Sequence, residues 1–356
     1  MTTVLKPKAI VLTDGVLHET DAKTAHGLIR GTERYEIAAV IDSVHAGKDA
    51  GEILDGKHRN IPIYAHVEDA VKTITDIQYC IIGVATPGGV LPQHFLPILE
   101  SCIRHRISLV NGLHEYLNDK PALTALAKEY DVKLIDVRKP KDRKDLHFWT
   151  SEIFSVDAPI IAVIGTDCAL GKRTTCRLVK QACADAGLNA QMIYTGQTGW
   201  LQGGQYGFIF DSTLNDFISG ELEHALVSCW KETNPDVILI EGQSGLRNPS
   251  GPCGSELLVS GNAKNVILVH APKRKYFDHI PDWGTINSLS SEIELIKMYG
   301  SKVIAVAINT EHCSNEEAVA FQAQYEAALQ LPVLLPLQQG VEKIIPFIKS
   351  IVKNQP

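Results

Sequence analysis

The stretch VIGTDCALGKRTT, Val163–Thr175, decides how the second half of the chain folds. It follows an apolar run that ends at Ile164, contains Gly165 and Gly171, and continues into a segment of helical spacing that begins near Lys172. A glycine-containing loop between a strand and a helix presents backbone N–H groups to phosphate oxygens, and the positive end of the helix adds to the attraction. The sequence therefore predicts a phosphate-binding loop at this position.

One position departs from the usual pattern of such loops, in which a hydroxyl directly after the lysine binds magnesium. That position is Arg173, whose guanidinium cannot ligate a metal. Either Thr174 takes the role after a shift of one residue, or the site does not need magnesium. The residues assigned to phosphate binding are Gly165, Thr166, Asp167, Cys168, Gly171, Lys172, Arg173, Thr174 and Thr175.

Outward from this loop, short apolar runs alternate with segments of helical spacing along most of the chain. Val- and Ile-rich runs between helices are typical of parallel strands that are covered on both faces. Among the expected strands are residues 8–13, 36–42, 79–89 (which run into a Gly/Pro turn) and 236–243. The fold class predicted for both halves is α/β with a mainly parallel sheet.

Residues 139–158 interrupt this alternation, because they carry many charges and little periodicity. We place a domain boundary near residue 150, which gives expected domains of residues 1–150 and 151–356.

The composition, with 45% hydrophobic and 21% charged residues among 356, is that of a soluble globular protein. A net charge of −7 disfavours nonspecific binding to nucleic acid or acidic membranes. The eight cysteines show no CxxC pair or metal-ligand spacing, which favours a reduced, cytoplasmic location. No apolar run has the length that spans a bilayer. We expect small-molecule substrates, no nucleic-acid or membrane partner, and a homo-oligomer.

Carboxylates are expected to gather beside the phosphate loop, at the carboxyl edge of the sheet, where ligands bind in open α/β folds. Glu241 ends the strand 236–243, and Asp211 and Asp216 lie at the end of the glycine-rich stretch 195–217. Glu241 is more typical of a functional residue. Asp216 is equally well explained as a carboxylate in the first turn of a helix.

Two resemblances to known families bear on function. The second half, through GTDCALGKRTT (165–175) and EGQSG (241–245), is similar to dethiobiotin synthetase. A second resemblance extends over nearly the entire chain, and its motifs occur in the expected order. These motifs are AKTAHGLIR (22–30), RYEIAAVID (34–42), IIGVATPGG (81–89), GLHEYL (112–117), DVRKP (136–140), GTDCALGKRTT (165–175), TGQTGW (195–200), DFISG (216–220) and IEGQSGL (240–246). They resemble a family long described as a domain of unknown function and now associated with D-glutamate N-acetyltransferase.

The second resemblance implies a Rossmann-like N-terminal domain and a P-loop NTPase-like C-terminal domain. It also implies transfer of an acetyl group from acetyl-CoA, the co-substrate, to the amine of D-glutamate in D-amino acid catabolism. An enolase-type N-acetyl-D-glutamate racemase would be the pathway partner. Coenzyme A carries a pyrophosphate and a 3′-phosphate, so a phosphate loop is useful without hydrolysis and no metal is required.

Acetylation of an amine needs a base, because the amine is mostly protonated at pH 7. Glu241 is the first candidate, Asp211 the second and His114 the third. Each has a structural alternative: Glu241 orients loops, Asp211 caps a helix, or His114 is a hydrogen-bonded histidine at a domain seam.

A dicarboxylate substrate needs cationic side chains, and arginine suits planar bidentate contacts. Arg138 and Lys139 follow an expected strand end, where they are candidates for substrate binding. Arg247 and the run 273–275 (Lys-Arg-Lys) are alternatives, although most such charge runs are simply solvated.

Two other functions stay open: an ATP- and Mg-dependent ligase or kinase of the dethiobiotin synthetase type, and a nucleotide-binding regulatory protein without catalysis. Arg173 favours the acyltransferase, whereas Asp211 and Glu241 favour the ATP-dependent enzyme. The regulatory protein would bind its ligand tightly without turnover. The turn 84–89 lacks the GxGxxG fingerprint, so no NAD site is predicted.

Overall fold

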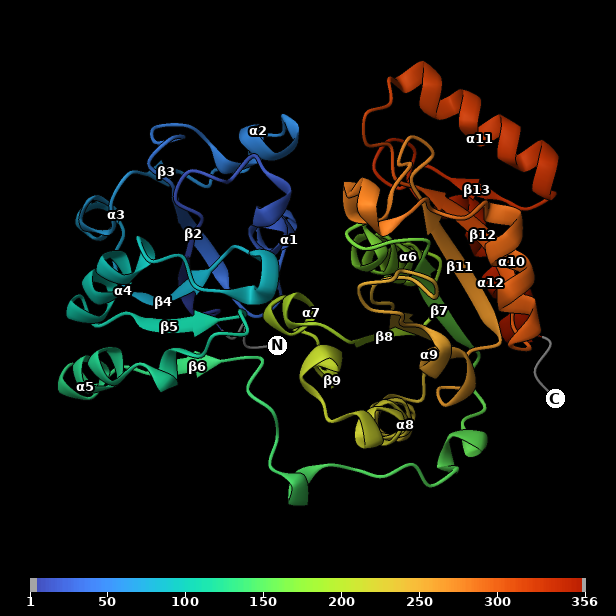
Figure 1. Cartoon of the computed structure of the whole chain (residues 1–356), viewed down its shortest axis with the longest axis horizontal. Coiled ribbons are helices and arrows are strands. Elements are labelled where there is room, and N and C mark those ends of the chain that lie inside the picture. Colours follow the sequence, from blue (N-terminus) through green and yellow to red (C-terminus); the bar gives the residue numbers. More distant parts are fainter. Residues whose placement is uncertain (1–4, 354–356) are drawn as a thin grey trace. The chain divides into compact units, whose positions relative to one another are not determined.

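The computed structural model describes residues 5–353 and divides into two compact units (Figure 1). The first unit contains the chain up to Pro140 together with Gln197–Gly204. The second contains Lys141–Gly196 and the chain from Gln205 onward. Two α/β units with parallel sheets confirm the fold class predicted from the sequence. The division falls at Pro140 and not near residue 150.

The first unit is built on a six-stranded sheet of order β3-β2-β1-β4-β5-β6, in which each neighbouring pair is parallel. This is the strand order of doubly wound dinucleotide-binding folds. The strands are β1 (Lys8–Leu12), β2 (Glu36–Ile41), β3 (Ile63–Tyr64), β4 (Ile77–Ile82), β5 (Ser108–Asn111) and β6 (Leu134–Asp136). The helices are α1 (Lys23–Arg30), α2 (Ala50–Asp55), α3 (Val67–Thr73), α4 (Phe95–Arg104), α5 (Pro121–Glu129) and α7 (Gln197–Leu201).

Both faces of the first sheet are buried, as its central strand shows. Ile10 and Leu12 of β1 belong to one apolar cluster, whereas Ala9 and Val11 belong to another. Successive side chains of a strand point to opposite faces, so an unbroken apolar run is needed when helices cover both faces. The run KAIVL satisfies this requirement.

Helix α7 comes from the second half of the sequence but packs within the first unit. Gln202, just after α7, donates to the backbone oxygens of Gly27 and Gly31 at 2.7 and 2.9 Å. The guanidinium of Arg34 lies 4.0 Å from the centre of the Trp200 ring. These long-range contacts explain why Gln197–Gly204 belongs to the first unit.

The second unit is built on a seven-stranded sheet of order β13-β12-β11-β7-β10-β8-β9, again with parallel neighbours. The strands are β7 (Ile160–Gly165), β8 (Ala190–Tyr194), β9 (Tyr206–Gly207), β10 (Val237–Glu241), β11 (Asn265–His270), β12 (Lys302–Ile308) and β13 (Val333–Leu334). The helices are α6 (Lys172–Asp185), α8 (Asn215–Thr233), α9 (Ser255–Val259), α10 (Leu289–Met298), α11 (Asn315–Leu329) and α12 (Ile345–Lys353).

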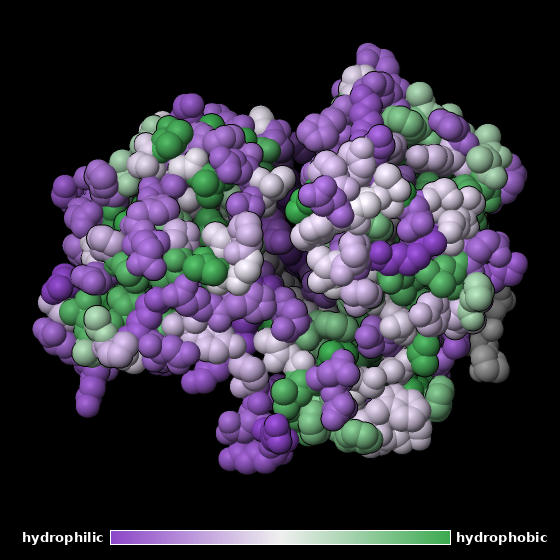
Figure 2. Space-filling model, in the orientation of Figure 1, coloured by the Kyte–Doolittle hydropathy of each residue, from purple (hydrophilic) through white to green (hydrophobic). Residues whose placement is uncertain are grey.

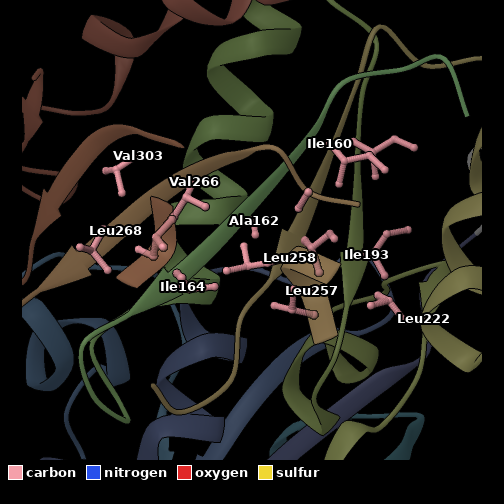
Figure 3. Close-up of a cluster of buried hydrophobic side chains, with 14 of the residues drawn as sticks. Ile160, Ala162, Ile164, Ile193, Leu222, Leu257, Leu258, Val266, Leu268 and Val303 are labelled. Carbon is pink, nitrogen blue, oxygen red and sulfur yellow. The ribbon is translucent and has the colours of Figure 1, made fainter. Parts of the chain in front are cut away.

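Strand β7 lies between β11 and β10, in the interior of this sheet. Ile160, Ala162 and Ile164 lie in one apolar cluster with residues of α8 and α9, among them Leu222 and Leu257 (Figure 3). The alternate residues of β7 pack on the opposite face in a cluster that includes residues of α6. The strand that leads into the predicted phosphate loop is therefore held on both faces, which fixes the position of its carboxyl end.

The charged segment that follows Pro140 packs on the second unit through two buried glutamates of α8. Glu221 is 2% exposed and Glu223 is 3% exposed. Glu221 accepts from the backbone N–H of His147 at 2.8 Å, and Glu223 accepts from that of Ile153 at 3.1 Å. Buried acceptors therefore order this segment on the second unit, although it is charged and has little periodicity.

The described residues form no helix that combines the length and apolar character needed to cross a membrane. On the face shown in Figure 2, hydrophobic residues occur in small groups among hydrophilic ones.

Candidate phosphate-binding and catalytic site

The predicted phosphate loop has the expected strand–loop–helix geometry, since β7 ends at Gly165 and α6 begins at Lys172. Gly171, the residue before the helix, has a φ of 90°, a conformation that favours glycine. A Cβ on Gly165 would lie 3.1 Å from Cδ of Lys172. The two glycines therefore serve different purposes: Gly171 allows the turn, and Gly165 gives the lysine side chain room to cross the loop.

Lys172 is 6% exposed, and its ammonium group lies against the loop. Nζ donates to the backbone oxygens of Asp167 at 2.6 Å and Ser244 at 2.7 Å. Burial lowers the pKa of Lys172, and the nearby Cys168 and Asp167 oppose this change. A buried cation that is bonded to neutral carbonyl oxygens is well placed to be attracted by a phosphate.

The carboxylate of Asp167 is fully buried and bonded within the protein. One oxygen accepts from the amide of Asn248 at 2.6 Å. The other accepts from Nη1 of Arg274 and from the backbone N–H of Asp278, both at 2.9 Å. Its side chain thus fixes the loop to the segments that follow β10 and β11, and the predicted ligand contact of Asp167 is left to its backbone.

Two further loop side chains are held by polar neighbours. The thiol of Cys168 donates to the hydroxyl of Ser244 at 3.3 Å, and burial raises its pKa. The hydroxyl of Thr166 lies 3.1 Å from Nδ1 of His270. Burial, with a contribution from Arg274, lowers the pKa of His270 to about 4, so this imidazole is neutral at pH 7.

Glu241 lies at the carboxyl end of β10, beside the strand that carries the loop, and is paired in register with Val163. It is 4% exposed, and its carboxylate accepts from the backbone N–H of Thr195 at 3.4 Å. Burial raises the pKa of Glu241, although the charge of Arg173 opposes the change. A carboxyl group with a raised pKa takes up a proton more readily near neutral pH, which suits a general base.

The remaining loop residues lie in the first turn of α6. Thr175 is buried, whereas Arg173 and Thr174 are partly exposed. The charge of Arg173 acts on Glu241, so this arginine links the loop to the candidate base electrostatically. Whether Thr174 replaces the missing magnesium ligand stays a prediction.

Three other predicted residues also belong to the second unit. Asp211 is exposed in a short 3-10 turn before α8, and Asp216 is exposed in the first turn of α8. Nε of Arg247 donates to Glu292 of α10 at 2.8 Å, and Glu292 is 2% exposed. Part of the Arg247 guanidinium is therefore already engaged by a buried carboxylate.

The three remaining candidates belong to the first unit, whereas the loop and Glu241 belong to the second. His114 is exposed just after β5. Arg138 is buried and donates to the backbone oxygen of Gly112 at 2.5 Å and to Gln197 at 2.9 Å. Lys139 is exposed.

The P-loop domain of a family described as a domain of unknown function, DUF1611, matches residues 147–345. The chain belongs to this family. The Rossmann-like N-terminal domain of DUF1611 matches residues 43–140. A crystal structure of a DUF1611 protein from Anabaena variabilis is similar to this chain, with a TM-score of 0.88 and 28% identity, over 97% of this chain and 100% of that one.

Two curated relatives of this DUF1611 chain carry the name D-glutamate N-acetyltransferase. The protein from Tritonibacter scottomollicae is 28% identical over 277 residues, which cover 76% of this chain and 81% of the relative. The protein from a Pseudoalteromonas species is 28% identical over 271 residues, which cover 74% and 79%.

Sequence reasoning missed most of the side chains that surround the loop of this DUF1611 chain. The sequence indicates Arg274 only as one of three cations in a charge run, and it assigns no role to Asn248 or Glu311. A usable signal existed, since Arg274 follows β11 and Glu311 follows β12, at the same edge as Glu241. Ligand atoms of Asp167, Cys168 and Asp278 lie within 4.8 Å of one another, but the Asp167 carboxylate already accepts the hydrogen bonds described above.

Proposed function

We propose that this protein is an N-acetyltransferase that transfers the acetyl group of acetyl-CoA to the amine of D-glutamate. Membership of DUF1611 and the name shared by two relatives support the reaction. The structural observation that carries the proposal is Glu241, a buried carboxyl group of raised pKa on the strand beside the phosphate loop. We also place the protein in the cytoplasm, in keeping with its free cysteines.

In this reaction the loop would hold the acyl donor and Glu241 would hold the proton. The amides of residues 166–171 and the ammonium of Lys172 suit the diphosphate of coenzyme A, which stays intact. Glu241 takes a proton from the substrate ammonium, and the free amine attacks the thioester carbonyl carbon. The C–N bond forms, the C–S bond breaks, and the CoA sulfur leaves as a thiolate. The attacking nitrogen gives up its second proton, which the thiolate takes up, and Glu241 returns the first proton to solvent.

The ATP-dependent alternative keeps one specific point in its favour. In P-loop NTPases an acidic residue at a strand end helps to hold magnesium, and Glu241 is such a residue. Against it, the residue after Lys172 is Arg173, and the Asp167 carboxylate is engaged by protein donors.

One assay separates the two functions. The protein is incubated with acetyl-CoA and D-glutamate while free thiol is measured, and separately with ATP and Mg²⁺ while phosphate is measured. L-glutamate and D-aspartate serve as matched acceptors that differ in configuration or in chain length. We expect thiol release that depends on D-glutamate. Phosphate release without thiol release would overturn the proposal.

The base is identified by three matched substitutions, Glu241→Gln, Asp211→Asn and His114→Gln. Each removes a candidate proton acceptor with little change in side-chain volume. We expect the first alone to abolish most of the turnover, and full turnover by Glu241→Gln would remove this residue from the role of base.

A further inference from the structure

Arg274 lies beside the loop and connects two acidic residues, Asp167 and Glu311. It is 6% exposed. Nη1 donates to the Asp167 carboxylate at 2.9 Å and to the backbone oxygen of Cys168 at 2.6 Å. Nε and Nη2 donate to the two carboxylate oxygens of Glu311, both at 2.6 Å. Burial lowers the pKa of Arg274, but bonding to Glu311 and Asp167 outweighs it and raises the pKa above its ordinary value.

The contacts of Arg274 reduce the effect of a buried negative charge within the loop. Asp167 places a buried negative charge in a segment whose amides are suited to phosphate. An unpaired buried carboxylate would repel a phosphate, and repulsion is strong where water is excluded. The guanidinium of Arg274 offsets part of the charge of Asp167, because it is shared with Glu311, and through the carbonyl of Cys168 it also restrains the loop backbone.

In other phosphate-binding loops, a metal ion supplies the positive charge that lies beside the phosphates. In P-loop NTPases a magnesium ion, held by the hydroxyl after the lysine and by a strand-end acid, supplies the local positive charge. Here Arg173 replaces the hydroxyl, and Arg274 engages the Asp167 carboxylate within the loop, although Glu241 stays at its strand end. We infer that Arg274 is a positioning residue that acts as a built-in cation, so that the loop binds a diphosphate group without a divalent metal.

The choice of coenzyme A as the natural ligand rests on the proposed function, whereas the role of Arg274 concerns any diphosphate on the loop. Binding of CoA and of ADP is therefore measured by calorimetry, each with EDTA or with MgCl₂. For the unaltered protein we expect the Kd of at least one ligand to be the same with and without Mg²⁺, since an effector that does not couple leaves affinity unchanged.

In the Arg274→Ala variant, Asp167 loses its counter-charge. We expect the Kd in EDTA to rise at least about tenfold. We expect Mg²⁺ to restore part of the affinity, because the Asp167 carboxylate loses one of its hydrogen bonds and an oxygen of it lies within 4.8 Å of one of Asp278. The double variant Asp167→Asn/Arg274→Ala removes both charges and should lose the response to Mg²⁺. If Arg274 had only a structural role, its replacement would not make ligand binding respond to Mg²⁺.

Lys231→Ala is the matched control, because Lys231 is an exposed cation of the second unit that pairs with Glu152. It should bind like the unaltered protein. If Arg274→Ala does not fold by circular dichroism, Arg274→Lys keeps the charge and loses the planar fork, and it should bind more weakly but still without metal.

Three results would overturn the inference: a need for Mg²⁺ in the unaltered protein, unchanged binding by Arg274→Ala in EDTA, or a metal-dependent Arg274→Lys. Absence of binding of both ligands to the unaltered protein would overturn it as well. Binding of ADP but not of CoA, with the expected pattern among the variants, would reject the proposed function and leave the role of Arg274 standing.

Discussion

Each unit of the protein carries a buried acidic residue at the carboxyl end of a strand, and the two residues have opposite environments. Asp42 follows β2 of the first unit and is fully buried. It accepts from the hydroxyl of Thr13 and the backbone N–H groups of Leu17 and His45, and lies 2.8 Å from Nδ1 of His45. The carboxylate of Glu241, in the second unit, accepts a long bond from the backbone N–H of Thr195 at 3.4 Å.

The pKa values of the two acids follow from these partners. Burial alone would raise the pKa of Asp42, but the hydrogen bonds from Thr13 and His45 outweigh it and hold the pKa below its ordinary value. Burial dominates at Glu241 and raises its pKa. Asp42 therefore stays ionised and has a structural role, whereas Glu241 is able to exchange a proton.

The comparison also bears on ligand binding by the first unit. In dinucleotide-binding folds an acid at the end of the second strand binds a ribose hydroxyl. The oxygens of Asp42 are occupied by protein donors, so they are less available to a ribose hydroxyl.

We expect Glu241 and Asp42 to differ most strongly in their effect on kcat. Glu241→Gln should lower kcat by about 10²–10⁴-fold, the usual contribution of a general base. KM for acetyl-CoA should change little, because the loop is untouched. Steady-state thiol release checks this, with Asp42→Asn as the counterpart, measured per folded molecule. An equal loss of kcat in both variants would contradict the assignment of chemistry to the second unit.

The next effect concerns the stability that Asp42 provides. Asp42→Asn should reduce the free energy of unfolding at pH 7 by about 2–4 kcal/mol, because buried donors lose their acceptor. The pKa of Asp42 is lowered in the folded state, so its contribution is present above its ordinary pKa and is lost as pH falls. The difference between variant and unaltered protein, measured by urea unfolding, should narrow as the pH is lowered from 7 to 3.

Asp69→Asn is a suitable control for this measurement. Asp69 is an exposed acid paired with Lys72, and such pairs contribute about 0–1 kcal/mol. A loss at Asp69 as large as that at Asp42 would show that burial of the acceptor is not the cause.

Glu241 should also affect the free energy of unfolding, by a small amount that depends on pH. The pKa of Glu241 is raised in the folded state, so the folded protein binds this proton more tightly and loses stability as pH rises. Glu241→Gln removes that penalty and should be more stable by about 1 kcal/mol at pH 8, as is common when a functional residue is replaced. The gain should disappear near pH 4, and a gain of the same size at both values would contradict a raised pKa.

The sequence predicted the architecture and the loop because both depend on local patterns. Val- and Ile-rich runs such as β7 require cover on both faces, and the glycines around Lys172 require a turn at the end of that strand. Glu241 was predicted for a related reason, since a charged residue directly after an apolar strand lies at the ligand edge of the sheet.

The missed features depend on pairs of residues that are distant in the sequence. Asp167 and Arg274 are separated by 107 positions; both follow apolar strands, which places them at one edge of the sheet but does not indicate that they pair. The placement of Gln202 in the first unit depends on backbone oxygens of Gly27 and Gly31, which carry no sequence signal. Such contacts arise from tertiary packing and become visible only in the structure.

The central claim is that residues 165–175 hold the diphosphate of coenzyme A, and a crystal structure with bound CoA tests it most directly. We expect the diphosphate on the amides of the loop, with Nζ of Lys172 moved from the backbone oxygens of Asp167 and Ser244 onto a phosphate oxygen. An unchanged Lys172 together with CoA bound at another place would contradict the account.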